Sequence, residues 1–235
     1  MKSLAVVFCY NEGAKLRRVL EKIRGDSGYD TIIIDDGSSD ESPAIMSEFK
    51  IPVVRHEKNL GVGTSMRSAF SYAKNHQYDV ILMIAGNGKM DVDHIPRLLD
   101  PIVNEGVDYV QGSRYLSGGG SANMPLYRTI MIRIFTGLVN LFMGIRGTDV
   151  TCGFRAYRMD IFERAEINID QEWLGKYEME YYIHYKVLKK KLKFVEVPIT
   201  MIYPEERKNY SKIKAGSGWW SMVRPWIFLV LKIKK

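Results

Sequence analysis

Short apolar runs alternate with amphipathic segments through the first half of the chain. The apolar runs are almost uninterrupted, which is typical of strands that are covered on both faces. Strands are expected at residues 4–9, 31–34, 53–55 and 80–84. Between them, residues 12–24 and 62–75 place apolar side chains at helical spacing. Strands that alternate with helices predict an α/β fold with a mainly parallel sheet and right-handed crossovers.

The second half of the chain has a less regular pattern. Helices are expected at residues 124–145 and 176–190, and strands at 107–111, within 149–157 and, as one run, at 194–202. Neither a repeat nor a linker-like change of composition divides this pattern. We therefore expect one domain over residues 1–215, followed by a short segment over 216–235.

That final segment changes the charge balance of the chain, whose net charge is +7. From Arg207 to the end there are eight Lys or Arg and no acid, while residues 1–206 hold 26 bases and 27 acids. The bases are mixed with Trp219, Trp220 and Trp226, a composition that favours an anionic membrane surface over a nucleic-acid groove. A solvated tail is the alternative. Because no apolar run approaches the ~20 residues needed to cross a bilayer, we expect the tail to lie on a membrane.

The cysteines and the N-terminus bear on the compartment. Cys9 and Cys152 have neither pairing nor metal-ligand spacing, so free thiols in a reducing compartment are expected. The chain enters its first strand without the basic and apolar regions of a signal peptide. With the basic tail, these features predict a peripheral protein on the cytoplasmic face of a membrane.

Polar residues follow the first two expected strands at the points where those strands end. Tyr10, Asn11 and Glu12 follow the first strand, and Asp35 and Asp36 end the second. Ligands of parallel α/β sheets bind beyond the carboxyl ends of the strands, so these residues are expected to share one site. Two carboxylates can accept hydrogen bonds from the imide N–H and ribose hydroxyls of uridine or guanosine. A turn with an N-cap is the alternative.

Two further segments have features of phosphate binding. Residues 59–67 begin with Asn59 and Gly61 and end with Arg67; the glycines allow close backbone approach, and a helix N-terminus favours anions. The segment lacks the Lys and the spacing of a Walker A loop, and a plain helix entry is the alternative. The second segment is Gly112-Ser113-Arg114 with Arg128 further on, since Arg binds phosphate bidentately.

Taken together, these blocks resemble the family-2 glycosyltransferases, especially the polyprenyl-phosphate sugar synthases of the dolichol-phosphate mannosyltransferase type. The resemblance covers roughly residues 3–212 and implies a GT-A fold that binds a nucleotide-diphosphate sugar. It implies donor-binding roles for Tyr10, Asn11, Glu12, Asp35, Asp36, Asn59, Gly61, Arg67, Asn87, Ser211 and Lys212. It implies that Ser113, Arg114 and Arg128 meet the acceptor phosphate. Asp149 would orient the donor sugar or act as a base; a buried Asp that caps a turn is the alternative.

One departure from the family concerns the turn after the strand at 80–84. There the family carries Asp-x-Asp-x-Gln and holds a divalent cation, whereas this chain has Ala85, Asn87 and Lys89. Mg²⁺ and Mn²⁺ prefer carboxylate oxygens, so no metal cofactor is predicted. We expect Lys89, assisted by Lys212, to meet the leaving diphosphate as a point charge in place of the metal.

The predicted reaction is an inverting transfer of a sugar from a UDP- or GDP-linked donor to a polyprenyl phosphate. A phosphate monoester, with a second pKa of about 6, needs no general base. Two alternatives stay open: transfer to a glycan hydroxyl, with Asp149 or Glu178 as base, and a degenerate member that binds a nucleotide or lipid phosphate without transfer. Nucleic acid is not an expected partner, because the body of the chain is near neutral.

Overall fold

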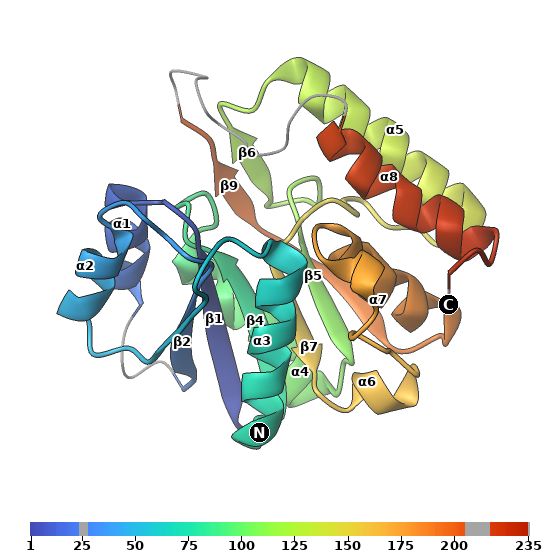
Figure 1. The fold of residues 1–235 in the computed structure, drawn as a ribbon. Helices are drawn as coiled ribbons and strands as arrows, with labels where there is room; N and C mark the ends of the chain where they lie inside the picture. Colours follow the sequence, from blue (N-terminus) through green and yellow to red (C-terminus); the bar gives the residue numbers. More distant parts are fainter. Residues whose placement is uncertain (24–27, 205–216, 235) are drawn as a thin grey trace.

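The computed structural model describes residues 1–23, 28–204 and 217–234. At its centre is a seven-stranded sheet in the order β3-β2-β1-β4-β7-β5-β8 (Figure 1). Its strands are β1 (Ser3–Cys9), β2 (Asp30–Asp35), β3 (Val53–Arg55), β4 (Val80–Ala85), β5 (Tyr109–Ser113), β7 (Arg155–Arg158) and β8 (Phe194–Pro198). Neighbouring strands are parallel except β7, which runs antiparallel to both β4 and β5. The predicted α/β fold with a mainly parallel sheet is confirmed.

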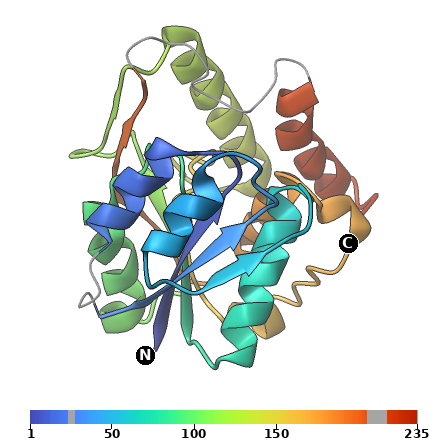
Figure 2. The same ribbon diagram turned by 60° about the vertical axis from the view of Figure 1, so that its left-hand side comes forward.

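Helices cover both faces of this sheet (Figures 1 and 2). On one face lie α1 (Ala14–Lys22), α2 (Ser42–Glu48) and α4 (Ile95–Glu105), and on the other α3 (Val62–Asn75) and α7 (Glu178–Lys189). Alternate residues of β1 enter the two cores: Ala5 and Val7 pack with the first group, Leu4 and Val6 with the second. This two-sided burial is the physical reason for the continuous apolar run at residues 4–9. Short elements complete these layers: η1 (Val92–His94), α6 (Ile161–Arg164) and η2 (Glu172–Leu174).

The strand expected over residues 194–202 is two strands in two sheets. β8 ends at Pro198 beside β5, whereas β9 (Thr200–Ile202) pairs with β6 (Gly120–Ala122) in a separate two-stranded sheet. Ile199, between them, is fully buried, and its N–H donates to the carbonyl of Ser113. The chain therefore changes sheets without leaving the core, and its apolar pattern shows no break.

Two helices lie beyond the carboxyl ends of the parallel strands: α5 (Leu126–Met143) and α8 (Ser217–Val230) (Figures 1 and 2). Helix α8 packs against α7 and buries Met222, Trp226 and Leu229 in the core cluster on that face. The Tyr185 hydroxyl of α7 donates to the Leu229 carbonyl at 3.2 Å. Residues predicted to form a membrane-facing tail thus complete the core of the main domain, because their apolar stripe meets an uncovered face of α7.

Helix α5 differs from the sequence expectation in its length and apolar character. Over the described residues it is the one helix that is long and apolar enough to cross a membrane by length and composition, with 18 residues and a mean hydropathy of 1.3. The expectation that no apolar run approaches this length was wrong. Only 22% of the helix is buried, so packing against the domain accounts for a minor part of its apolar surface.

Candidate active site

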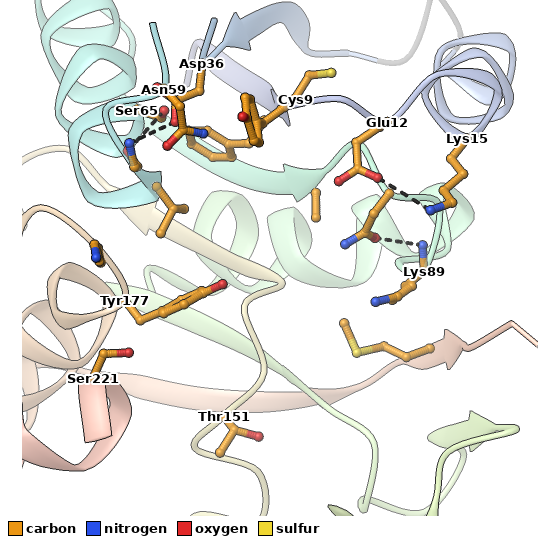
Figure 3. A pocket seen from close by; sticks show the side chains of 18 of the residues that line it. Cys9, Glu12, Lys15, Asp36, Asn59, Ser65, Lys89, Thr151, Tyr177 and Ser221 are labelled. Atoms are coloured by element: carbon orange, nitrogen blue, oxygen red, sulfur yellow. Dashed lines mark hydrogen bonds and ion pairs between the residues drawn. The ribbon is translucent and has the colours of Figure 1, made fainter. Parts of the chain in front are cut away.

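A cavity of about 970 Å³ lies at the carboxyl ends of the parallel strands. Its walls come from the ends of β1 and β4, the loop after β2, the first turns of α3 and α7, and helices α5 and α8. Figure 3 shows Asp36 and Asn59 on one side, Tyr177 and Ser221 on another, and Lys89 apart from both. The residues predicted for substrate binding that line it are Tyr10, Glu12, Asp36, Asn59, Gly61, Asn87, Lys89, Arg114 and Arg128.

Asp36 shapes the wall of the cavity that lies next to α3. Its carboxylate accepts hydrogen bonds from the backbone N–H groups of Leu60 and Gly61, each at 2.9 Å, and lies 2.8 Å from Nδ1 of His56. These contacts hold the loop that leads into α3 and brings Asn59 to the cavity. Asp36 therefore orders this wall of the cavity.

The first turn of α3 packs without any gap on the loop before α7. Gly61 has φ +94°, and a Cβ there would lie 2.6 Å from the Gly175 carbonyl oxygen. A Cβ on Gly63 would lie 2.0 Å from the Leu174 oxygen, so both positions require glycine. This close approach brings Lys176, which sequence reasoning did not single out, to the cavity.

The turn after β4 presents no carboxylate where a divalent cation would need one. Ala85, Asn87 and Lys89 line the cavity, and the Asn87 side-chain oxygen accepts the Lys89 backbone N–H at 3.1 Å. The Lys89 carbonyl accepts from Ile202 at 2.9 Å, which ties the turn to β9. Over the described residues, no three His, Cys, Asp or Glu side chains form a group that could hold a metal. With a neutral amide as its only oxygen and a lysine beside it, this donor set does not fit Mg²⁺ or Mn²⁺.

Asp91 and Asp93 follow this turn and do not line the cavity. The Asp91 side chain accepts the Asp93 N–H and so caps η1, and it also pairs with Lys22 at 3.1 Å. The Asp91 carboxylate thus serves as the N-cap of η1.

Arg114 and Asp149 form a buried ion pair under the cavity. Nε of Arg114 donates to Oδ2 of Asp149 at 2.6 Å, and Nη2 donates to Oδ1 at 2.7 Å. The side chains are 2% and 0% exposed. Burial alone would lower the pKa of Arg114, but the Asp149 charge raises it well above the usual value. Arg114 is thus permanently charged, and Asp149 is sequestered beneath the cavity instead of facing it.

The segment that carries Asp149 is held from two strands. The Gln111 side chain donates to the carbonyls of Asp149 at 2.6 Å and Cys152 at 3.2 Å. Glu196 accepts the backbone N–H groups of Thr148 and Asp149 at 2.6 and 2.9 Å. Burial raises the pKa of Glu196, and these two hydrogen bonds oppose the rise. The position of the ion pair is therefore determined by β5 and β8, which are distant in sequence.

Tyr203 organises the cations on this side of the cavity. Its hydroxyl accepts a hydrogen bond from Nη1 of Arg114 at 2.8 Å. Its ring lies under Nζ of Lys89, 5.5 Å from the centroid, and under Cζ of Arg128, 5.8 Å from the centroid. Cations are attracted to the face of an aromatic ring at such distances. Tyr203 thus brings together three basic side chains from three separate segments.

Several predicted residues lie outside the cavity lining, each with partners within the protein. Ser113 contacts Thr148 through a 2.6 Å hydroxyl pair, and Arg67 donates to the carbonyls of Ile169 and Gln171. The predicted site residues that do not line the cavity are Asn11, Asp35, Arg67, Ser113 and Asp149. Ser211 and Lys212 lie outside the described residues. The roles predicted for all seven residues stay predictions. The five described residues do not line the cavity and are placed to support the residues that do.

Sequence reasoning missed part of the lining. The missed polar and aromatic residues are Phe8, Lys15, Ser65, Thr151, Lys176, Tyr177, Tyr203, Trp220, Ser221 and Arg224. For Thr151 a signal existed, because it lies two residues after Asp149, which was already a candidate site residue. No local pattern marks the residues of α8, since their place depends on how that helix packs.

The charges of the lining indicate the kind of ligand. Six lining residues are Lys or Arg, and three are Asp or Glu. One of those acids, Asp36, is engaged by backbone donors, and Glu178 pairs with Arg224. A cavity lined by one sign of charge concentrates ligands of the opposite sign. The fold and the cavity are those of an α/β protein with an anion-compatible site at its strand ends.

The family of the chain follows from comparison with known proteins. Residues 4–165 match the family model described as glycosyl transferase family 2. The match spans more than half of the chain, which belongs to this family and is a glycosyltransferase.

Two curated relatives align over most of their length. One is the polyprenol monophosphomannose synthase of Mycolicibacterium smegmatis, 25% identical over 224 residues that cover 92% of this chain and 82% of the relative. Another is the UDP-N-acetylglucosamine–dolichyl-phosphate N-acetylglucosaminyltransferase of Methanococcus voltae, 27% identical over 219 residues, 85% of each chain. A solved structure, glucosyl-3-phosphoglycerate synthase from Mycobacterium tuberculosis with Mn²⁺ and UDP-glucose, aligns with TM-score 0.73 and 16% identity over 100% of this chain and 80% of that chain. This structural likeness shows the GT-A fold, as predicted.

Proposed function

We propose that this glycosyltransferase moves a sugar from a nucleotide-diphosphate donor to a polyprenyl phosphate. The observation that carries the proposal is one cavity whose lining holds five basic residues besides the buried, paired Arg114, enough to receive two anionic substrates. The names of the relatives, which act on polyprenol or dolichyl phosphates, support the acceptor class. The donor side is the wall formed by Asp36, Asn59 and Gly61, where backbone and carboxylate groups suit a nucleoside.

A phosphate acceptor also agrees with the ion pairing of the two candidate general bases, Asp149 and Glu178. A sugar hydroxyl would need a general base within hydrogen-bond reach, whereas a phosphate oxygen is already anionic at neutral pH. Asp149 is fully buried and paired with Arg114, and Glu178 is paired with Arg224. Neither offers a carboxylate ready to take a proton, which favours the phosphate acceptor over a glycan hydroxyl. The main catalytic task is then to hold two anions in line at the anomeric carbon.

The proposal includes departure of the nucleoside diphosphate without a metal. Lys89 lies on the turn after β4 and borders the cavity beside Asn87. A lysine ammonium can stabilise the charge that develops on a leaving diphosphate, the task that a divalent cation otherwise performs. The unsuitable donor set of Ala85 and Asn87 supports this assignment.

The lipid part of the acceptor would approach along α5. One face of that helix exposes large apolar side chains: Leu126, Tyr127, Ile130, Met131, Ile134, Leu138, Leu141 and Phe142. Arg128, on the same helix, lines the cavity. We assign this face to a membrane surface, where α5 lies in the plane of the lipid headgroups and the phosphate enters beside Arg128. A location on the cytoplasmic face stays a prediction.

The test is a transfer assay with labelled UDP- and GDP-sugars, farnesyl phosphate as a soluble acceptor, and EDTA. Wild type is expected to form the sugar-phospholipid in EDTA, and Lys89→Ala to reduce kcat about tenfold or more because a charged contact to the leaving group is lost. Lys74→Ala, which removes an exposed lysine on α3, is the control and retains activity. Transfer that requires Mn²⁺ would contradict the role of Lys89. No transfer from either donor, with or without Mn²⁺, would contradict the acceptor class.

A further inference from the structure

Helix α8 forms one wall of the cavity. Trp220, Ser221 and Arg224 line it, while Met222 and Trp226 are buried on the side of the helix that faces α7. This division follows from helical geometry, because residues three and four apart share a face. A segment at the far end of the sequence therefore brings a cation to a cavity whose other walls come from the first 204 residues.

Arg114 cannot supply the cation for an acceptor phosphate, because its donors are already engaged. A guanidinium has five N–H donors. Nε and Nη2 donate to Asp149, Nη2 also donates to Thr151 at 2.7 Å, and Nη1 donates to Tyr203 at 2.8 Å and to the sulfur of Met124 at 3.7 Å. Five bonds to the protein leave no N–H for a ligand.

Arg224 differs from Arg114 in that fewer of its N–H donors are bonded to the described part of the protein. Its Nη2 pairs with Oε1 of Glu178, whose side chain is 0% exposed, and this pair fixes where the guanidinium lies. Its Nε is buried and has no hydrogen-bond partner. The side chain as a whole is 32% exposed at the cavity. The residue is thus anchored on one side by a buried carboxylate, and among the described residues its side-chain hydrogen bond is the one to Glu178.

Arg128 of α5 lines the same cavity as Arg224. Tyr177 lies next to Glu178 in sequence, and Figure 3 shows it projecting into the cavity above Ser221. Burial raises the pKa of the Tyr177 hydroxyl, and the charge of Arg128 is among the interactions that lower it. Arg128 and Arg224 thus line the same cavity from two different helices, α5 and α8.

We infer that Arg224 binds the acceptor phosphate, opposite Arg128, and takes the part that the engaged Arg114 cannot play. The inference rests on the proposed transfer to a polyprenyl phosphate. A phosphate monoester offers three oxygens, enough for two guanidinium groups at once. The acceptor phosphate would then join α5 and α8, the two helices beyond the strand ends, so acceptor affinity depends on the docked position of α8.

Binding of farnesyl phosphate, measured by calorimetry without donor, tests this assignment. Arg224→Gln is expected to weaken binding about tenfold to a hundredfold, because hydrogen bonds to a charged group are lost. Affinity for the nucleoside diphosphate should stay within about twofold, since the contact is on the acceptor side. Arg224→Lys, which keeps the charge and loses the planar fork, should fall between wild type and Arg224→Gln.

A second variant separates ligand binding from a merely structural ion pair. Glu178→Gln removes the anchoring charge but keeps the arginine and a neutral hydrogen-bond acceptor, so it should weaken farnesyl phosphate binding less than Arg224→Gln does. Equal weakening by Glu178→Gln and Arg224→Gln would overturn the inference, as would wild-type affinity in the Glu178→Gln/Arg224→Gln double variant. Lys232→Gln, beyond the end of α8, is the control and leaves binding unchanged. If wild type fails to bind farnesyl phosphate and fails to transfer to it, the proposed function itself is contradicted.

Discussion

Two ion pairs of this protein have similar geometry and very different surroundings. Arg114 and Asp149 are 2% and 0% exposed, whereas Arg17 and Glu48 are 39% and 51% exposed, and in both pairs the shortest N–O distance is 2.6 Å. Removing one partner of a buried pair leaves an uncompensated charge, while an exposed pair contributes little. The Arg114 pair is therefore expected to matter for stability as well as for the site.

Arg114→Gln should lower the free energy of unfolding by about 3–5 kcal/mol, measured by chemical denaturation. Asp149→Asn should have a similar effect, and the Arg114→Gln/Asp149→Asn double variant should cost less than the sum of the two. Arg17→Gln is the matched control and should leave the unfolding midpoint nearly unchanged. Equal midpoints for Arg114→Gln and Arg17→Gln would show that burial does not distinguish the two pairs.

At the residue scale, the sequence located many lining residues but not their partners. Tyr10, Asn59 and Lys89 reach the cavity because they follow parallel strands, whose ends must meet at one edge. The same argument placed Arg114 there without showing that its donors are taken by Asp149 and Tyr203. Hydrogen-bond partners 35 or 89 residues apart in the chain depend on packing that no local pattern encodes.

At the element scale, the exposed face of α5 is the feature with a measurable consequence. Leu141 and Phe142 are 77% and 65% exposed, so their replacement leaves the core intact. Leu141→Gln/Phe142→Gln should reduce binding to anionic vesicles at least about tenfold in a cosedimentation assay, because two apolar side chains no longer enter the lipid interface. Val103→Gln, on the separate helix α4, is the control. Unchanged vesicle binding by the α5 variant would contradict the membrane assignment of this face.

Helix α8 illustrates what an element's own sequence leaves open. Its mixture of tryptophans and bases is compatible with a membrane surface, and Trp220 is indeed 52% exposed. Trp226 of the same helix is 6% exposed and packs against Tyr181 and Tyr185. Whether an apolar residue meets lipid or protein depends on which neighbouring face is uncovered, and that face belongs to α7.

At the scale of the whole molecule, His184 links stability to pH. It is fully buried, and its Nδ1 lies 3.1 Å from the hydroxyl of Tyr109, whose own proton is donated to Gln111. Burial, with a further contribution from the Arg155 charge, holds the pKa of His184 well below its usual value of 6.5. Below that pH the unfolded chain binds a proton that the folded protein excludes. The stability due to neutral His184 is thus fully present above pH 6.5 and is lost as the pH falls below it.

The free energy of unfolding should therefore fall between about pH 6.5 and pH 5 by up to about 1.4 kcal/mol per pH unit from this residue. His184→Phe should remove that part of the slope, since Tyr109 keeps its bond to Gln111. Denaturant titrations at several pH values measure it, with His76→Gln, at an exposed position, as the control. An identical slope in wild type and His184→Phe would show that the buried ring is not the source.

The sequence by itself determined the class of fold, the strand ends that carry the site, and the loss of carboxylates from the turn at 85–89. These follow from local periodicity and from residue identity, which are present before the chain folds. The antiparallel insertion of β7 between β4 and β5, the change of sheets at Ile199 and the docking of α8 were decided only by the tertiary structure. The physical reason is that the hydrophobic effect is non-directional. The sequence pattern shows which side chains are buried, but the partner that each one packs against depends on which apolar surfaces are exposed when the chain folds.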